Sequence, residues 1–326
     1  MGKRITGKGA ERKFKLGMHS YTLHLSGFGE SWGFQAYGET HAFERAMNLE
    51  QLFDLSEEVG LDVVHITLVD LENDTSDAHL KKVRESAKKH GLELELNVSF
   101  NAPSDPRVNA TVEEALTVGH KLNCNLVKFS LDTEHPVRSS HSCMCPEVMV
   151  QLADRYEQFK ACIPLMEKYN MKVAIENHCD TFADEVIWLV EQLNHPLIGA
   201  CCDTINSLVL MEGIEECVRK MAPYTYCVHF CDNKIVVDPD GTHSLGTAIG
   251  QGNLDCAAIM NVFRELAPPE LDTIDLEIEL PLSGYTIEEG RKLEIQGLRD
   301  SVKYMREELG LGIRKPKAKK AAKKAK

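Results

Sequence analysis

The sequence lacks the features that mark membrane, secreted or multidomain proteins. No apolar run reaches the roughly 18 residues that a membrane-spanning helix needs, and residues 1–15 contain no apolar core of the kind found in secretory signals. No stretch rich in proline, glycine or serine divides the 326 residues. We therefore expect a single domain, a cytoplasmic location and no contact with membranes.

Paired cysteine motifs are also missing. The eleven cysteines are odd in number and scattered through apparent strands and helices. Cys143 and Cys145 lie close together, as do Cys201 and Cys202, but no second pair accompanies them at the spacing that a zinc motif requires. We expect reduced thiols in structural positions.

Positive charge is scarce outside the C-terminus. The net charge is −13, although residues 315–326 carry seven lysines and follow Arg314. Without these eight positive charges, residues 1–313 carry about −21, which repels phosphate backbones. We expect no nucleic-acid partner, a flexible basic N-terminus over residues 1–13, a catalytic domain over 14–310 and a disordered lysine-rich tail over 311–326.

Short apolar runs alternate with longer amphipathic stretches from residue 14 onward. The apolar runs predict eight strands: Lys15–Ser20, Val63–Thr67, Leu92–Val98, Leu126–Leu131, Lys172–Asn177, Leu197–Asp203, Tyr226–Phe230 and Thr273–Glu279. Helical periodicity predicts eight helices: Leu49–Gly60, Ala78–His90, Val112–Leu122, Val148–Tyr169, Phe182–Leu193, Ile214–Met221, Asp255–Leu266 and Ile287–Leu309. This alternation indicates parallel βαβ units. Eight units favour an α/β fold of the closed (β/α)8 TIM-barrel type over an open doubly wound sheet.

The last four predicted strands each carry an ionisable side chain near their C-terminal end. Strand alternation turns Glu176 and His178 toward the barrel interior. The next three strands bring further side chains to the same level: Asp203, His229, and either Glu277 or Glu279. Three carboxylates in one barrel mouth repel one another and are costly to desolvate, and a divalent cation relieves both problems. Three oxygen ligands and one imidazole suit Mn, Mg, Co or Zn.

Motifs around these residues resemble those of the xylose-isomerase-like barrel superfamily, which comprises sugar isomerases, epimerases, inosose dehydratases and family-two apurinic endonucleases. The resemblance covers residues 16–309 and rests on three motifs: Ile-Glu-Asn-His at 175–178, Cys-Asp-Thr at 202–204 and Val-His-Phe-Cys-Asp at 228–232. Two positions depart from the family pattern. Cys231 replaces a lysine, and His65 stands where the family usually has glutamate.

The resemblance implies a set of metal ligands and a type of reaction. The ligands that it carries over are Glu176, Asp203, His229 and Glu277, with Glu279 as the alternative fourth ligand, and manganese is the ion we expect first. A metal bound to neighbouring sugar oxygens stabilises the enolate formed when a proton leaves the carbon next to a carbonyl. Glu176 and Glu277 are then the catalytic pair that exchanges this proton.

The neighbours of these motifs are candidates for contact with the substrate. His178, Asn206 and Asp232 follow the metal motifs directly and are predicted to orient the sugar. His19 opens the stretch 19–34, rich in glycine and aromatic residues, and is a further candidate for substrate binding.

The long connection after the fourth predicted strand carries three further candidates. His135 and His141 are predicted as additional catalytic acids or bases near neutral pH. Arg138 between them is predicted to bind an anionic group of the substrate.

Several reactions within the superfamily stay open. The first is isomerisation or epimerisation of a sugar or keto-sugar. The second is elimination from a 3-keto-glycoside by a lyase, because residues 19–34 resemble the catalytic (alpha) subunit of C-glycoside deglycosidases, which pairs with a small β-sandwich subunit. Cleavage at abasic sites fits poorly with the acidic barrel. A non-catalytic sugar-binding barrel is the remaining alternative. We expect an oligomer in either enzymatic case.

Overall fold

Eight parallel strands close into a barrel in the computed structural model, which describes residues 12–34, 39–41, 43–136, 144–282 and 284–316. Each strand pairs with its neighbours along the chain, and the first pairs with the last. The barrel strands are β1 (Lys15–His19), β4 (Val63–Thr67), β5 (Glu93–Ser99), β6 (Leu126–Ser130), β7 (Lys172–Glu176), β8 (Ile198–Asp203), β9 (Thr225–Phe230) and β12 (Thr273–Leu276). The predicted TIM barrel is confirmed.

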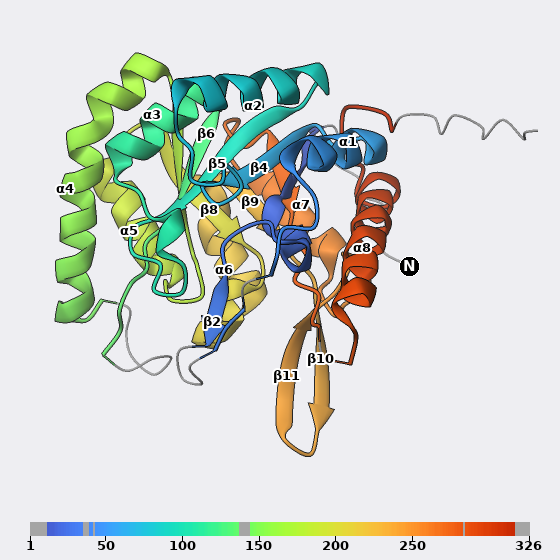
Figure 1. The fold of residues 1–326 in the computed structure, drawn as a ribbon. Coiled ribbons are helices and arrows are strands. Elements are labelled where there is room, and N and C mark those ends of the chain that lie inside the picture. The colour runs from blue at the N-terminus through green and yellow to red at the C-terminus, as the bar shows by residue number, and fades with distance from the viewer. Residues whose placement is uncertain (1–11, 35–38, 42, 137–143, 283, 317–326) are drawn as a thin grey trace, which may run out of the picture.

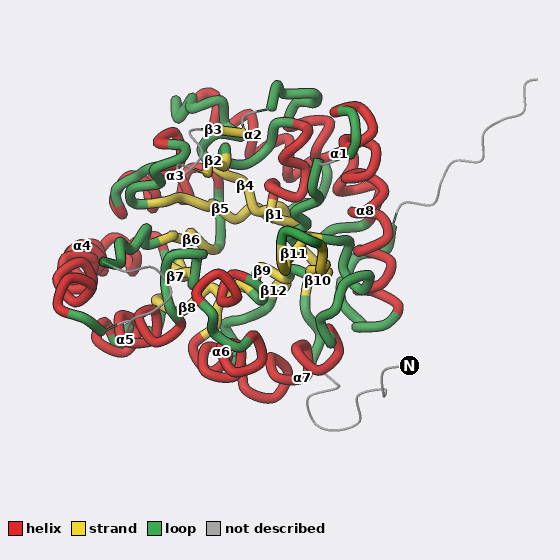
Figure 2. The backbone as a smooth tube through the Cα atoms, turned by 90° about the horizontal axis from the view of Figure 1, so that it is seen from below, coloured by secondary structure: helices red, strands yellow, loops and turns green. Residues whose placement is uncertain are grey.

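Helices surround the barrel as an outer ring (Figures 1 and 2). They are α1 (Leu49–Val59), α2 (Asp77–Lys89), α3 (Val112–Leu122), α4 (Pro146–Tyr169), α5 (Ala183–Leu193), α6 (Ile214–Met221), α7 (Cys256–Leu266) and α8 (Ile287–Glu307). Side chains from the outer strand faces and the inner helix faces form one apolar core. None of the described helices is long and apolar enough to cross a membrane.

Local sequence signals set the ends of these helices. Asn48, Thr111 and Thr286 begin α1, α3 and α8 with capping boxes, in which the cap side chain accepts a hydrogen bond from a backbone N–H three residues on. Gly60 ends α1 at a φ of 85°, a left-handed conformation that glycine adopts at little cost. The chain then enters β4 within three residues.

Additional elements lie at the C-terminal end of the barrel. After β1 come the 3₁₀ helix η2 (Ser20–Ser26) and the short pair β2 (Trp32–Phe34) and β3 (Glu39–His41). After β9 comes an antiparallel hairpin of β10 (Asn233–Asp238) and β11 (Gly241–Gly246), which projects away from the barrel (Figure 1). The connection between β9 and α7 is therefore partly regular.

The C-terminal segment contradicts part of the predicted domain boundary. Disorder was expected from residue 311, but Leu311 is 2% exposed and the following residues bond to the barrel. The N–H of Gly312 donates to the carbonyl of Phe14 over 2.9 Å, and the N–H of Arg314 donates to Asp62 over 2.8 Å. Apolar burial and paired backbone groups hold residues 311–314 in place. Residues 317–326 lie outside the described part of the chain.

Candidate active site

The predicted metal ligands meet inside the C-terminal mouth of the barrel. Nδ1 of His229 on β9 lies 2.9 Å from Oε1 of Glu176 and 3.0 Å from Oε2 of Glu277. Asp203 at the end of β8 joins His229 and Glu277 with ligand atoms within 4.8 Å of one another. All four side chains are at most 8% exposed. Three carboxylates thus lie around the imidazole of His229, and this donor set fits a divalent cation.

Glu176 forms an ion pair with a lysine that was not among the predicted site residues. Lys128 on β6 is buried and forms an ion pair with Oε2 of Glu176, and Ser130 donates a hydrogen bond to the same oxygen over 3.0 Å. Burial alone would raise the pKa of Glu176. The positive charges of Lys128 and His229 outweigh burial and hold the pKa well below its usual range. Glu176 is therefore ionised at neutral pH, with Oε1 directed toward His229.

Asp203 has the opposite electrostatic environment. Burial and the negative charges of Glu277 and Glu176 raise its pKa to about 7. Its Oδ1 accepts hydrogen bonds from the backbone N–H groups of Ile205 and Asn206, each over 2.7 Å. These two bonds fix the carboxylate at the start of the loop after β8. A cation in the mouth would supply the positive charge that the group needs in order to ionise fully.

The position of Glu277 distinguishes it from Glu279. Glu277 follows β12 directly, is 8% exposed and contacts both His229 and His19. Its Oε1 lies 3.3 Å from Nδ1 of His19 at the end of β1. Glu279 lies further out and is exposed. The geometry thus favours Glu277 as the fourth ligand and brings His19, a predicted substrate-binding residue, into the same cluster.

The three predicted substrate neighbours lie in different settings. His178 is half-buried beyond β7, with Nδ1 3.7 Å from Asp180, and Asn206 is half-buried beside Asp203. Asp232 is 1% exposed, and its carboxylate accepts hydrogen bonds from the N–H groups of residues 250, 252 and 254. These bonds fold the loop that leads into α7. The substrate contact predicted for Asp232 stays a prediction.

Of the three candidate residues predicted in the loop after β6, the structure describes one, His135. His135 is half-buried, and its Nε2 lies 2.8 Å from Glu185 in the first turn of α5. Its ring also packs edge-on against Phe182. The catalytic role predicted for it stays a prediction. Arg138 and His141 lie outside the described residues.

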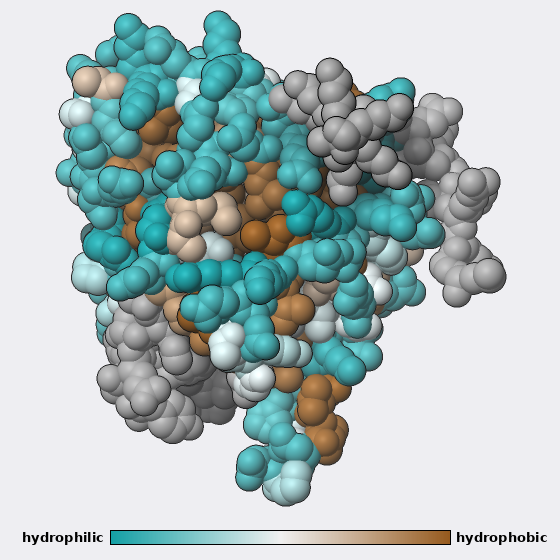
Figure 3. All heavy atoms as spheres, turned by 45° about the vertical axis from the view of Figure 1, so that its right-hand side comes forward, coloured by the Kyte–Doolittle hydropathy of each residue, from teal (hydrophilic) through white to brown (hydrophobic). Residues whose placement is uncertain are grey.

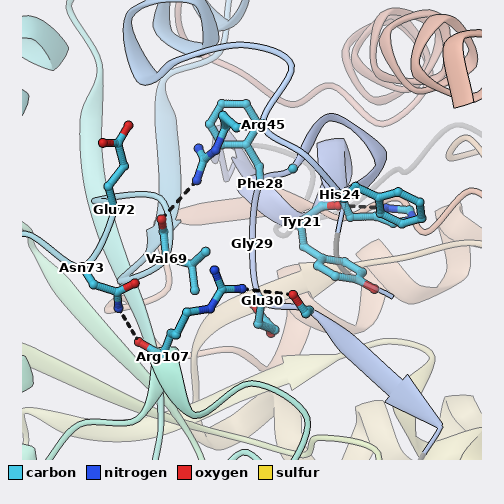
Figure 4. A pocket seen from close by; sticks show the side chains of 13 residues that line it. Tyr21, His24, Phe28, Gly29, Glu30, Arg45, Val69, Glu72, Asn73 and Arg107 are labelled. Carbon is cyan, nitrogen blue, oxygen red and sulfur yellow. Dashed lines mark hydrogen bonds between the residues drawn. The ribbon is translucent and has the colours of Figure 1, made fainter. Parts of the chain in front are cut away.

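A pocket of about 340 Å³ opens over the ends of β1, β4 and β5 (Figure 4). Its walls combine aromatic and charged side chains: Tyr21, His24, Phe28, Glu30, Phe43, Arg45, Glu72, Asn73 and Arg107. Tyr21 connects the pocket with the metal-ligand candidates. Burial raises the pKa of its hydroxyl well above 10, and the charges of Glu279, Glu30 and Glu277 raise it further. The pocket and the carboxylate cluster are therefore neighbours in the barrel mouth.

A sequence signal for Lys128 did exist. In the strand Leu126–Ser130, alternation places residues 126, 128 and 130 on one face, and Leu126 lies inside the barrel beside Ala174. A lysine on that face points into the barrel, where an unpaired charge would be costly. It therefore required an acidic partner on an adjacent strand, and Glu176 on β7 is that partner.

Comparison with protein families identifies the barrel. The family model described as a xylose isomerase-like TIM barrel matches residues 30–308. The chain belongs to this family. The resemblance inferred from the three sequence motifs is confirmed.

Two curated proteins are similar in sequence to this chain over much of its length. YihM from Escherichia coli (strain K12) is 24% identical over 69% of the chain, and the match spans 66% of YihM, slightly less than two thirds. The 3-oxo-isoapionate decarboxylase of Pectobacterium atrosepticum is 22% identical over 79% of the chain and 87% of its own length.

Solved structures of other xylose isomerase-like barrels share the fold. A D-psicose 3-epimerase crystallised with D-fructose has a TM-score of 0.59 at 17% identity, and the match covers 90% of this chain and 98% of the epimerase. The IolI protein with a bound zinc atom has a TM-score of 0.59 at 18% identity, covering 88% and 98%. A Mycobacterium smegmatis barrel in complex with magnesium has a TM-score of 0.57 at 16% identity, covering 91% and 100%. Metal ions are thus bound by related barrels.

Proposed function

We propose that the protein is a divalent-metal-dependent enzyme that moves a proton on the carbon next to a carbonyl of a sugar or keto-sugar, as an isomerase or epimerase does. The observation that carries this proposal is the pair Glu176 and Glu277, whose carboxylates lie 2.9 and 3.0 Å from the same atom, Nδ1 of His229. Two carboxylates facing one point can act as base and acid on a carbon held between them. The similarity to a D-psicose 3-epimerase supports the same class of reaction.

Each side chain has a distinct task in this proposal. A divalent cation held by Glu176, Asp203, His229 and Glu277 would supply Lewis acidity to the oxygens of the substrate. Glu176 accepts the proton, because Lys128 and Ser130 occupy its Oε2 and leave Oε1 directed toward the mouth. Glu277 faces the same point from β12 and returns a proton to the carbon.

The wall of the pocket supports a substrate with hydroxyl groups. Arg45, Glu72, Asn73 and Arg107 bring charged and amide groups to one cavity, and Tyr21 lines the same cavity (Figure 4). Sugars are recognised by such side chains because each hydroxyl both donates and accepts hydrogen bonds. His19, His178 and Asn206 extend this polar surface around the carboxylates in our proposal.

A second candidate reaction is cleavage of a keto-sugar derivative by a lyase. The name of the Pectobacterium relative describes loss of carbon dioxide from a 3-oxo acid. Decarboxylation of a 3-oxo acid and proton removal next to a carbonyl both form an enolate, so the same carboxylates and cation could serve either reaction. Elimination from a 3-keto-glycoside by a C-glycoside deglycosidase belongs to the same group.

A solvent-exchange experiment tests the proposal directly. The protein, loaded with Mn²⁺, is incubated in deuterium oxide with D-fructose, D-tagatose and D-psicose, and with a 3-keto-glucoside. Epimerisation incorporates deuterium at the carbon next to the carbonyl, which NMR detects, whereas a lyase releases a leaving group or carbon dioxide. Glu277→Gln should lower the exchange rate by at least about 100-fold, the typical worth of a general acid or base.

Glu279→Gln is the matched control for this variant. It removes an exposed carboxylate two residues away, and we expect it to keep both metal and exchange. Asp203→Ala should bind no metal in the mouth. Stoichiometric Mn²⁺ in Asp203→Ala, or exchange that survives in Glu277→Gln and disappears in Glu279→Gln, would overturn the assignment.

Three further expectations belong to this proposal. We expect manganese as the metal and an oligomer as the assembly. If the lyase reaction is correct, we also expect a small β-sandwich subunit as the partner. Metal analysis of the purified protein, light scattering and co-purification measure them in turn. Three oxygen donors and one nitrogen accept Mn²⁺, Mg²⁺, Co²⁺ or Zn²⁺, so the comparison of reconstituted activities decides between these ions.

A further inference from the structure

A second cluster of ligand-type side chains lies below the mouth, inside the barrel. His65 on β4, Glu95 on β5, Cys227 on β9 and Asp275 on β12 place one ligand atom each within 4.8 Å of the others. The four side chains are buried, with exposed fractions of 0, 6, 1 and 0%. The interiors of such barrels are usually filled by branched apolar residues. A sulfur, a nitrogen and two carboxylates at this level therefore need an explanation.

Three of the distances within this cluster are close to the edges of a coordination tetrahedron. Nδ1 of His65 lies 3.6 Å from Oε2 of Glu95 and 3.9 Å from Oδ2 of Asp275, and Sγ of Cys227 lies 3.8 Å from the same Asp275 oxygen. With zinc–nitrogen and zinc–sulfur bonds of about 2.0–2.3 Å, the ligand atoms of a tetrahedral site lie about 3.3–3.8 Å apart. The cluster therefore has the size of a zinc site.

Unpaired polar atoms give a second, independent indication. Oε2 of Glu95, the atom that faces His65, and Oδ1 of Asp275 are buried and accept no hydrogen bond from the described residues, except from each other's carboxyl group when one of the two acids is protonated. A buried carboxylate oxygen without a partner costs about 1–3 kcal/mol or more. A metal ion at the centre of the cluster would bind Oε2 and neutralise the two acids.

We propose that the barrel interior holds a second cation, a structural zinc ion bound by His65, Glu95, Cys227 and Asp275. Four protein ligands close the coordination shell and leave no position for a substrate. The thiolate selects zinc over manganese, whereas the mouth, with oxygen and imidazole donors, accepts harder ions. Nε2 of His229 lies 3.4 Å from Nδ1 of His65, so the ring of His229 separates the two sites. The inner ion would stabilise the strands that carry the mouth.

Metal analysis of single variants separates the two sites. The protein is purified with a thiol reductant, loaded with zinc and Mn²⁺, desalted and analysed by mass spectrometry of its metals. We expect two equivalents in the natural protein, loss of one zinc in Cys227→Ser, and loss of only the other ion in Asp203→Ala. Cys202→Ser is the matched control, because Cys202 is equally buried on β8 but belongs to the outer core. It should keep both ions.

Cobalt substitution gives a readout that does not depend on activity. Co²⁺ bound to a thiolate shows a sulfur-to-cobalt charge-transfer band, which we expect in the natural protein, in Asp203→Ala and in Cys202→Ser but not in Cys227→Ser. Circular dichroism confirms that each variant is folded. If the natural protein takes up a single equivalent and shows no thiolate band, the inner site is overturned, whatever the fate of the mouth. If Asp203→Ala keeps both ions while Cys227→Ser still loses the zinc ion, the proposed function is overturned and the inner site is supported.

Discussion

Lys128 on β6 supplies the positive charge that lowers the pKa of Glu176 most strongly. Its side chain is 2% exposed, and its ammonium group donates to Glu176 and, over 2.9 Å, to the hydroxyl of Ser130. The pair therefore fixes which oxygen of Glu176 faces the mouth. Removal of the lysine leaves a buried carboxylate with one fewer cation.

We predict that Lys128→Met destabilises the metal-free protein by about 3 kcal/mol, the lower part of the range for breaking a buried ion pair. The reason is the uncompensated charge of Glu176, whose pKa then rises. Urea denaturation in the presence of a chelator measures the free energy of unfolding.

The double variant Lys128→Met with Glu176→Gln is the control for this pair. Because it removes both charges, it should be more stable than Lys128→Met alone. If the two substitutions destabilise additively, the ion pair does not couple Lys128 to Glu176.

A buried carboxyl group helps to join helix α8 to the 3₁₀ helix η2. Glu294 on α8 is 0% exposed, accepts a hydrogen bond from the N–H of Leu25 over 2.7 Å and another from the hydroxyl of Ser26 over 3.2 Å. Both partners belong to η2, which lines the pocket through Tyr21 and His24. Helix α8 thus holds one wall of the pocket against the barrel.

This contact predicts a specific pH dependence. Burial raises the pKa of Glu294 to about 8, above its ordinary value. Since the folded pKa exceeds the unfolded one, the stabilisation is complete at low pH and is lost as the pH rises through about 8. The natural protein should therefore lose on the order of 3 kcal/mol relative to Glu294→Gln between about pH 5 and pH 9.

Urea denaturation at a series of pH values measures this difference. Glu288→Gln removes an exposed carboxylate from the first turn of the same helix, and its stability should follow that of the natural protein at every pH. Parallel curves for the natural protein and Glu294→Gln would show that folding does not raise the pKa of Glu294.

Close packing of β1 against β12 makes a third prediction. A Cβ atom at Gly17 would lie 1.8 Å from Oδ1 of Asp275 and 3.1 Å from Val63. We expect Gly17→Ala to destabilise the fold by about 1–3 kcal/mol through overpacking, measured by thermal unfolding. Gly297→Ala on α8, where the nearest atom is 3.4 Å away, should instead leave stability unchanged or raise it, because alanine favours a helix. Equal effects of the two substitutions would contradict this packing argument.

At the level of elements, sequence periodicity predicted most of the fold. Val63–Thr67, Val112–Leu122 and Ile214–Met221 coincide with observed elements, because apolar residues recur there with the period of a strand or helix. The sequence periodicity did not predict the two strands of the hairpin β10–β11. Its side chains are mostly exposed, so no buried face imposes an alternation that the sequence could show.

The site was predictable only where a motif marked it. Asp203 and His229 stand in recognisable motifs at strand ends, whereas Glu95 and Asp275 lie inside strands with no motif around them. Their positions follow from the closed barrel, which brings β5 and β12 together across its interior although they are distant in sequence. Such a contact depends on the topology, and a single sequence contains no local signal for it.

The whole barrel is closed on its N-terminal side by the segment after α8. Asp62, at the start of β4, accepts hydrogen bonds from the N–H groups of Leu16, Ile313 and Arg314. The guanidinium of Arg314 donates to the carbonyls of His90, over 2.8 Å, and of residues 61 and 91. The end of the chain thus joins the first three barrel strands, on the face opposite the mouth.

Arg314→Ala therefore tests the contribution of this closure to the stability of the whole molecule. The substitution leaves three carbonyl groups without their charged donor, and hydrogen bonds to charged groups contribute about 1.5–3 kcal/mol each when buried. Because Arg314 is half-exposed and water can replace part of these bonds, we expect a loss of about 1–2 kcal/mol in total. Lys315→Ala, at the adjacent exposed position, should leave the free energy of unfolding unchanged. A loss of stability in both variants would point to the net charge of the tail, whereas a loss in Arg314→Ala alone, with the metal content of the mouth retained, would show that the segment stabilises the barrel from the side remote from its chemistry.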